Sequence, residues 1–201
     1  MSCTEIYAFD LEGNARLYGE VRNSWRGSMA VWCILENRHL PPFVPWYVKS
    51  CNWYHPDMAS EEVERRIGYK PSRALCHGGK EEPAREIWNL VDSPDIPEHE
   101  KIVLYTTFDH CLVRAENLPA VIAAFRQFDG DTSLKEQADI LQKAADDPEV
   151  IAIGWNQTSV NADTWSNAGG YDEARDEPIP YNCLTGNDHY WLFDDLKEGS
   201  L

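Results

Sequence analysis

Four side chains that zinc accepts as ligands lie in two short pairs near the middle of the chain. Cys51 and His55 are separated by three residues, and Cys76 is followed directly by His77. Two thiolates and two imidazoles suit a tetrahedral zinc site. Adjacent Cys and His side chains usually diverge, however, and the sequence contains no CxxC motif. The sequence therefore favours a chain without a cofactor and leaves zinc at these four residues as the alternative.

A second chemistry that cysteine supplies is nucleophilic catalysis. Cys76 precedes His77-Gly78-Gly79, whose backbone N–H groups could form an oxyanion site, and Cys111 follows Asp109-His110. Catalytic partners usually come from distant segments, so neighbours in the sequence are weak support for either cysteine. We expect Cys111 to point into the core from a strand. No phosphate-binding GxxxxGK or GxGxxG motif is present.

A third candidate is a stretch of amides, hydroxyls and indoles that follows an apolar strand. Such a set could hydrogen-bond and stack a small polar ligand, such as a sugar or a base. The competing interpretation is an internal network in which the amides satisfy loop backbone groups. The predicted ligand-binding residues are Trp155, Asn156, Thr158, Asn161, Asp163 and Trp165.

The formal net charge of −16 is concentrated toward the C-terminus. Residues 151–201 carry nine acids and two bases, a balance of −7, whereas residues 1–50 carry five of each. No basic patch stands out, so direct nucleic-acid binding is disfavoured. An acidic face can attract a basic protein, including one that binds nucleic acid, or the charge only keeps the protein soluble. The acids predicted to contact a partner are Asp172, Glu173, Asp176 and Glu177.

Tryptophan is abundant, with eight in the chain, and two of them lie in a segment rich in proline. The prolines at 41, 42 and 45 prevent a regular helix there. The aromatic side chains of residues 39–58 must therefore pack on the body of the protein or on a partner. Trp46 and Trp53 are the predicted partner contacts in this segment.

The secondary-structure elements that must position the candidate residues are predicted most clearly over 102–128. Ile102–Phe108 is rich in β-branched and aromatic residues and predicts a buried strand. A turn at Asp109-His110, a short strand from Cys111 and a helix from Leu118 follow. Residues 5–38 repeat the order strand, turn, strand, helix loosely. A duplication is one interpretation, and the other is that hairpin-plus-helix units are common.

Helices are also predicted over 60–67, 82–91, 133–145 and 188–196, and a strand over 150–155. Ser60 is an expected N-cap, and Ser133 forms a capping box with Glu136. Residues 156–180 read as a long loop. Together these elements predict an α+β fold in a single domain spanning 1–201, with a mixed or antiparallel sheet built from hairpin-plus-helix units and covered by helices.

No apolar run of the sequence is long enough to span a membrane, and the N-terminus lacks the apolar region of a secretory signal. The six cysteines are scattered singly and are typical of reduced thiols. We therefore expect a cytoplasmic protein.

These observations predict a non-enzymatic, acidic binding protein that acts as an inhibitor, an immunity-type protein or a regulatory module toward a basic protein partner. One alternative is a small enzyme or polar-ligand-binding domain that uses residues 155–165. Another is a structural subunit of a larger assembly. The sequence leaves the oligomeric state open.

Overall fold

The computed structural model describes residues 3–22, 28–39, 58–68, 87, 89–158 and 165–194. Its helices are α1 (Ser28–His39), α3 (Ser60–Ile67), η2 (Asn89–Asp92), α5 (Glu98–Tyr105), η3 (Ala115–Asn117), α6 (Leu118–Gln127) and α7 (Leu134–Ala145). Its strands are β1 (Cys3–Phe9), β2 (Ala15–Arg22), β3 (Cys111–Arg114), β4 (Ala152–Gln157), β5 (Tyr171–Asp172), β6 (Glu177–Pro178) and β7 (Tyr190–Trp191).

Five strands form one mixed sheet in the order β2-β1-β4-β3-β7. The pairs β1–β2, β1–β4 and β3–β4 are antiparallel, and β3–β7 is parallel. Strands β5 and β6 form a separate two-stranded hairpin. The fold is α+β, with helices packed on a mixed sheet, as the sequence predicts.

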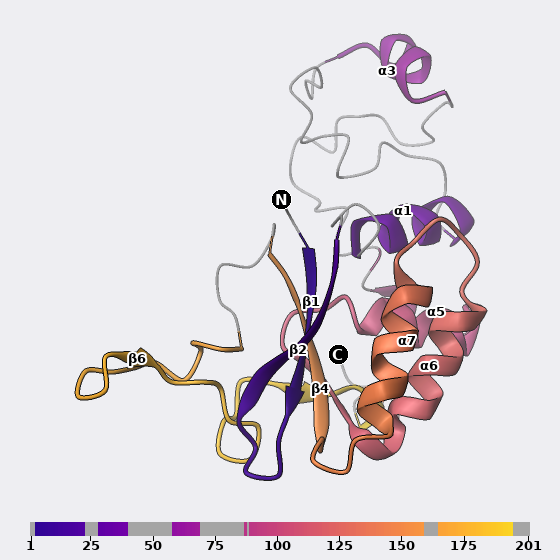
Figure 1. Cartoon of the computed structure of the whole chain (residues 1–201). Coiled ribbons are helices and arrows are strands. Elements are labelled where there is room, and N and C mark those ends of the chain that lie inside the picture. The colour runs from indigo at the N-terminus through magenta and orange to yellow at the C-terminus, as the bar shows by residue number, and fades with distance from the viewer. Residues whose placement is uncertain are drawn as a thin grey trace.

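Both faces of the central strands are covered. Helices gather on one face, here called the helix side (Figure 1). Alternate residues of a strand point to opposite faces, so Ile6 and Ile153 join the helices in one core, whereas Phe9 and Leu112 join a second core. The second core is closed by the C-terminal segment through Trp165, Tyr181 and Cys183, and this face is here called the C-terminal side.

The turn between β1 and β2 confirms the N-terminal hairpin. Asp10 Oδ1 accepts hydrogen bonds from the backbone N–H groups of Glu12 and Asn14, both at 2.9 Å. Gly13 adopts a φ of 84°, which glycine tolerates without strain. The predicted Asp109-His110 turn is also present, with a φ of 63° at His110.

The predicted strand over 102–108 is wrong, because residues 98–105 form helix α5. This helix packs against α1, α6 and η2, and four consecutive residues, Ile102–Tyr105, are buried. A short helix enclosed on most sides loses the polar stripe that marks a helix in sequence. The segment 98–127 therefore contains a helix, a turn, a strand and a helix in that order. It does not repeat the N-terminal hairpin-plus-helix unit.

The predicted closing helix over 188–196 begins instead as a strand. Tyr190 and Trp191 pair with β3 as β7, and the Tyr190 N–H donates to the His110 carbonyl at 3.2 Å. The chain is helical only from 192 to 194 within the described residues. Pairing with the available edge of β3 thus outweighs the helical preference that the local sequence pattern indicates.

Several predicted boundaries also shift. Helix α7 starts where predicted, but the side chain of Ser133 makes no capping bond to it. Residue 59, rather than Ser60, is the N-cap of α3, and α3 ends at Gly68 as predicted. The predicted loop 156–180 contains the end of β4 and the β5–β6 hairpin. Of the predicted helix 82–91, only residues 87 and 89–91 are described, and 89–91 belong to η2.

Candidate functional site

Strand β4 divides the predicted ligand-binding residues between the two faces of the sheet. Trp155 points to the helix side, where its indole N–H donates to Gln137 Oε1 at 3.1 Å. Asn156 points to the C-terminal side, is 2 % exposed, and donates from Nδ2 to Glu5 Oε2 at 2.8 Å. The two side chains cannot share one pocket, because adjacent strand residues face opposite ways.

Two further residues of this prediction serve the structure. Thr158 extends the β1–β4 pairing, because its hydroxyl accepts from the Cys3 N–H at 2.9 Å. Trp165 is 6 % exposed on the C-terminal side, and its Nε1 donates to the Trp155 carbonyl at 3.0 Å. Asn161 and Asp163 lie outside the described residues.

The helix-side face of β4 borders a small, partly open recess. Its free volume is about 30 Å³, which is room for a few water molecules. Apolar and aromatic walls come from α1, α7, β4 and the turn after α5, and polar groups come from the same turn, from α7 and from the ends of β1 and β4. The lining residues are Val31, Phe108, Leu134 and Trp155 on the apolar side and Thr4, Thr106, Thr107, Asp109, Gln137 and Gln157 on the polar side.

Gln157 lines this recess and carries a buried, unsatisfied acceptor. Its Nε2 donates to Thr4 Oγ1 at 2.6 Å across the β1–β4 pair. Its Oε1 is buried and has no hydrogen-bond partner in the described part of the chain. A buried acceptor without a partner destabilises a protein by about 1–3 kcal/mol, so the Gln157 carbonyl oxygen lowers the stability of this part of the fold.

Three other polar side chains of the recess are fixed by internal bonds. Gln137, 3 % exposed, holds the indole of Trp155 through Oε1 and donates from Nε2 to Ser133 Oγ at 2.9 Å. Thr106 and Thr107 donate their hydroxyl protons to the carbonyls of residues 103 and 104 at 2.8 and 2.5 Å. The recess is therefore preorganised, because its walls already occupy bonded positions.

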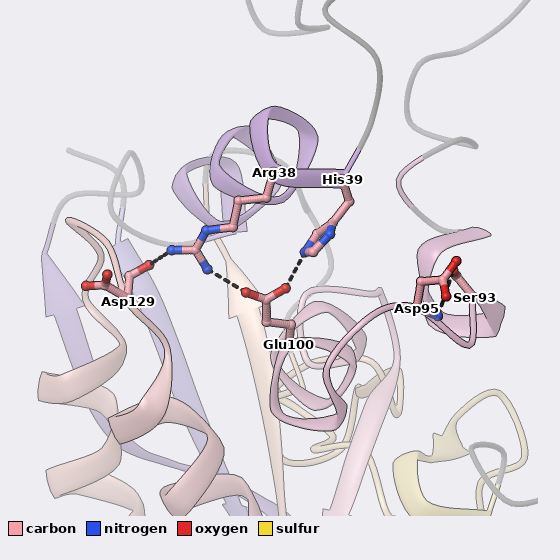
Figure 2. Close-up of polar contacts among 6 residues, drawn as sticks. All are labelled: Arg38, His39, Ser93, Asp95, Glu100 and Asp129. Carbon is pink, nitrogen blue, oxygen red and sulfur yellow. Dashed lines mark hydrogen bonds and ion pairs between the residues drawn. The ribbon is translucent and has the colours of Figure 1, made fainter.

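Helix α1 supplies one wall of the recess, and an ion-pair cluster fixes its end (Figure 2). Glu100, 4 % exposed at the start of α5, accepts from Arg38 Nη1 at 2.5 Å and also contacts His39 Nε2. Arg38 donates in addition to the Asp129 carbonyl. At the other end of α5, Trp32 Nε1 donates to Thr107 Oγ1 at 2.7 Å. These contacts hold α1 against both ends of α5.

A second group of titratable side chains lies on the C-terminal side. The Tyr181 hydroxyl is 2.8 Å from His189 Nδ1 and also interacts with the Asp188 carboxylate. Burial, followed by the interaction with Asp188, raises the pKa of Tyr181 to about 12. The hydrogen bond from Tyr181 lowers the pKa of Asp188, and burial lowers the pKa of His189. At neutral pH this group favours a neutral tyrosine and a neutral imidazole beside an ionised Asp188.

The cysteines of this region and of β3 are buried. Burial raises the pKa of Cys183 to about 11, which keeps its thiol protonated at neutral pH. Cys111 is 2 % exposed and faces the helix side, as expected for a core residue.

The structure brings four predicted partner contacts together in the β5–β6 hairpin. Asp172, Glu173, Asp176 and Glu177 all lie within residues 171–178, and the hairpin extends away from the sheet (Figure 1). Tyr171 is 56 % exposed and donates to Asp176 Oδ1 at 2.7 Å. Asp172 Oδ1 accepts from the backbone N–H groups of Ala174 and Arg175. These bonds give the acidic tip a defined shape.

The remaining predicted residues lie outside the described part of the chain. They are the zinc candidates Cys51, His55, Cys76 and His77 and the partner candidates Trp46 and Trp53. Among the described residues, no group of three or more His, Cys, Asp or Glu side chains could hold a metal ion. None of the helices in the described ranges has the length and apolar character that crossing a bilayer requires.

Sequence reasoning missed the polar lining of the recess and the Tyr181 group. The sequence around Gln137 predicts only a helix, and Thr106 lies in a segment predicted as a strand. Tyr181, Asp188 and His189 lie close in sequence, but a turn that brings Tyr181 back to His189 has no simple residue pattern. The alternation of β4 was the available signal, because it places Trp155 and Gln157 on one face.

Comparison of the chain with protein-family models, with curated proteins and with solved structures finds no match.

Proposed function

We propose that the protein is a non-enzymatic binding module that uses the β5–β6 hairpin to recognise a basic protein partner. The observation that carries this proposal is the clustering of four acids, Asp172, Glu173, Asp176 and Glu177, on one projecting hairpin. Arg175 lies among them at 3.7 Å from both Asp172 and Glu177, so the hairpin tip carries four negative charges and one positive charge.

The burial pattern of the hairpin supports a role outside the protein's own core. Residues 173–179 are all exposed, so the tip contributes little to either core. A hairpin with strands of two residues is marginal by itself in water. Its internal bonds, from the Tyr171 hydroxyl and to the Asp172 carboxylate, hold it in one conformation. A preorganised site loses less conformational entropy when a partner binds.

Charge and composition of the hairpin indicate the class of partner. Acidic groups steer a basic surface toward the hairpin and suppress acidic partners. Exposed Tyr171 and Ile179, at 56 % and 41 %, flank the acids and can supply apolar contact. The partner expected is therefore a protein with a basic surface, acted on as an inhibitor, an immunity-type protein or a regulator would act.

The test is an affinity capture with the tagged full-length chain as bait in extract of its own host. The hairpin variant carries Asp172→Asn, Glu173→Gln, Asp176→Asn and Glu177→Gln. The matched control variant carries Glu20→Gln, Glu116→Gln, Glu136→Gln and Glu149→Gln, which are exposed acids outside the hairpin. Each variant changes the formal net charge from −16 to −12.

We expect the wild type and the control variant to retain one basic protein that the hairpin variant loses. Retention should also fall steeply with added salt, since exposed charges are screened beyond about 8 Å at physiological ionic strength. Capture that survives in the hairpin variant, or that is indifferent to salt, would contradict the proposal.

A further inference from the structure

The exposed large apolar side chains of the described residues are concentrated in two segments, and none of them belongs to a helix. Exposed apolar side chains that are scattered singly need no explanation, whereas a concentration of them marks a surface that contacts another molecule. They are Leu11 and Leu17 in the β1–β2 hairpin and Tyr171, Ile179 and Leu184 in the C-terminal segment, with 41–65 % of each exposed.

Two of these residues, Leu11 and Leu184, lie on turns that are hydrogen-bonded to each other at one end of the sheet (Figure 1). Asn182 donates from Nδ2 to the Glu12 carbonyl at 2.9 Å. A Cβ at position 13 would lie 2.7 Å from Leu184 Cγ, so Leu184 rests directly on the backbone of Gly13. Both leucines are nevertheless more than 60 % exposed. The side chains of Leu11 and Leu184 on these two joined turns are here called the leucine surface.

The charges around the leucine surface are acidic. Residues 10–15 and 181–189 contain three acids and no lysine or arginine. Two of these acids, Glu12 and Asp188, are exposed. Arg16, which follows the first of these stretches, already pairs with an aspartate at 3.4 Å. Acids beside exposed apolar side chains complement a ligand that carries lysine or arginine next to apolar groups.

From the exposed leucines and the acids beside them, we propose that the leucine surface binds a basic amphipathic helix of a protein partner. The apolar face of that helix packs on Leu11 and Leu184, and its lysine or arginine side chains pair with Glu12 and Asp188. The joined turns are fixed before binding, so little conformational entropy is lost. The leucine surface is distinct from the acidic hairpin, and its role rests on the proposed function only in that the partner is basic.

The test uses a defined probe, a fluorescent helical peptide of about 18 residues with leucine on one face and lysine elsewhere. A second peptide carries serine in place of each leucine and has the same charge. Fluorescence anisotropy with the full-length protein measures the affinity at about 150 mM salt, where exposed charges are screened beyond about 8 Å. We expect saturable binding of the Lys/Leu peptide and at least tenfold weaker binding of the Lys/Ser peptide, which buries less apolar area.

Variants of the protein test the leucines and the acids separately. The double variant Leu11→Ser with Leu184→Ser should bind the Lys/Leu peptide at least tenfold more weakly and keep the Tm, because both side chains are exposed. Ile179→Ser, which removes an exposed apolar side chain next to the hairpin, is the matched control and should leave the affinity unchanged. Glu12→Lys should weaken binding several-fold more than Glu136→Lys, which makes the same charge change at an exposed position of α7.

Three results would overturn the proposal. The first is the absence of saturable binding of the Lys/Leu peptide. The second is equal binding of the Lys/Ser peptide, which would reduce the attraction to charge alone. The third is a loss of binding in the hairpin variant or in Ile179→Ser but not in the double leucine variant, which would place the peptide on the hairpin. None of these results touches the proposed function, which fails separately if capture of the basic protein does not depend on the hairpin acids.

Discussion

At the scale of single residues, the Tyr181 hydroxyl is close to Gly186 and interacts with the side chains of Asp188 and His189. A Cβ at position 186 would collide with the phenol, so only glycine leaves room for it. The ring packs edge-on against Phe9 and close to Trp165, with centroids 6.4 and 5.1 Å apart. Burial of the phenol raises the pKa of Tyr181, and the Asp188 carboxylate raises it further, because removing the proton would place a second negative charge beside Asp188.

This environment predicts a loss of stability at alkaline pH that depends on Tyr181. The pKa rises from 10.0 to about 12 on folding. The stabilisation is therefore complete below pH 10 and is lost as the pH rises from 10 toward 12, because only the unfolded state ionises easily in that window. Tyr181→Phe should lower the free energy of unfolding by about 1 kcal/mol near neutral pH, through the lost hydrogen bond.

The measurement is urea denaturation of wild type and Tyr181→Phe across this range. The wild type should lose its advantage over the variant between pH 10 and pH 12. Tyr171→Phe is the control for the removal of a tyrosine hydroxyl. The pKa of Tyr171 is also raised, through its hydrogen bond to Asp176, but Tyr171 lies on the exposed hairpin. A constant difference between wild type and Tyr181→Phe over the whole range would contradict the assignment.

At the scale of elements, the position of α1 depends on the Glu100 cluster. Glu100 is 4 % exposed and bonds Arg38 and His39 at the end of α1. Glu100→Gln should lower the free energy of unfolding by about 2–3 kcal/mol, since it leaves the Arg38 guanidinium without its counter-charge, although water screens the partly exposed Arg38. Urea denaturation measures this change.

The same substitution in α3 provides the comparison. Glu62 pairs with Arg65 and Arg66, at 2.5 Å to each, but on an exposed helix surface. Glu62→Gln should change stability little, because solvent screens exposed ion pairs. Equal losses of unfolding free energy in Glu100→Gln and Glu62→Gln would mean that the burial of Glu100 does not strengthen its ion pairs.

The elements also divide into those that the sequence predicts and those that it does not. The β1–β2 hairpin, β3, α6 and α7 follow from turn residues, β-branched runs and an amphipathic stripe. Helix α5 does not, because its buried sequence lacks a polar stripe. Strand β7 does not either, because its pairing with β3 is a tertiary contact between Cys111 and Tyr190, which are 79 residues apart in sequence.

The candidate sites divide in the same way. The acidic residues of the hairpin follow one another in sequence, so composition alone could select them. The recess combines residues from β1, α1, the turn after α5, α7 and β4, and its polar groups are common residue types. Only the fold brings Thr4 next to Gln157 and Gln137 next to Trp155.

At the scale of the whole molecule, the charge balance opposes compactness. The chain has 34 acids and 18 bases, so even complete pairing of the bases would leave 16 acids in excess. Excess like charge destabilises the compact state through self-repulsion. Raising the ionic strength from about 10 mM to about 150 mM shortens the screening length from about 30 Å to about 8 Å. We therefore expect the Tm to rise over this range.

Differential scanning calorimetry of the two charge variants separates this global effect from the role of the hairpin. The hairpin variant and the control variant both reach a net charge of −12, so both should show a smaller rise of Tm with salt than the wild type. Their partner binding should nevertheless differ, because only one of them lacks the acidic tip. A Tm that falls with added salt would mean that ion pairs such as Arg38–Glu100 outweigh the repulsion. In that case, the acids outside the hairpin stabilise the fold through ion pairs, and the effect of the hairpin's excess charge on stability must be measured separately from theirs.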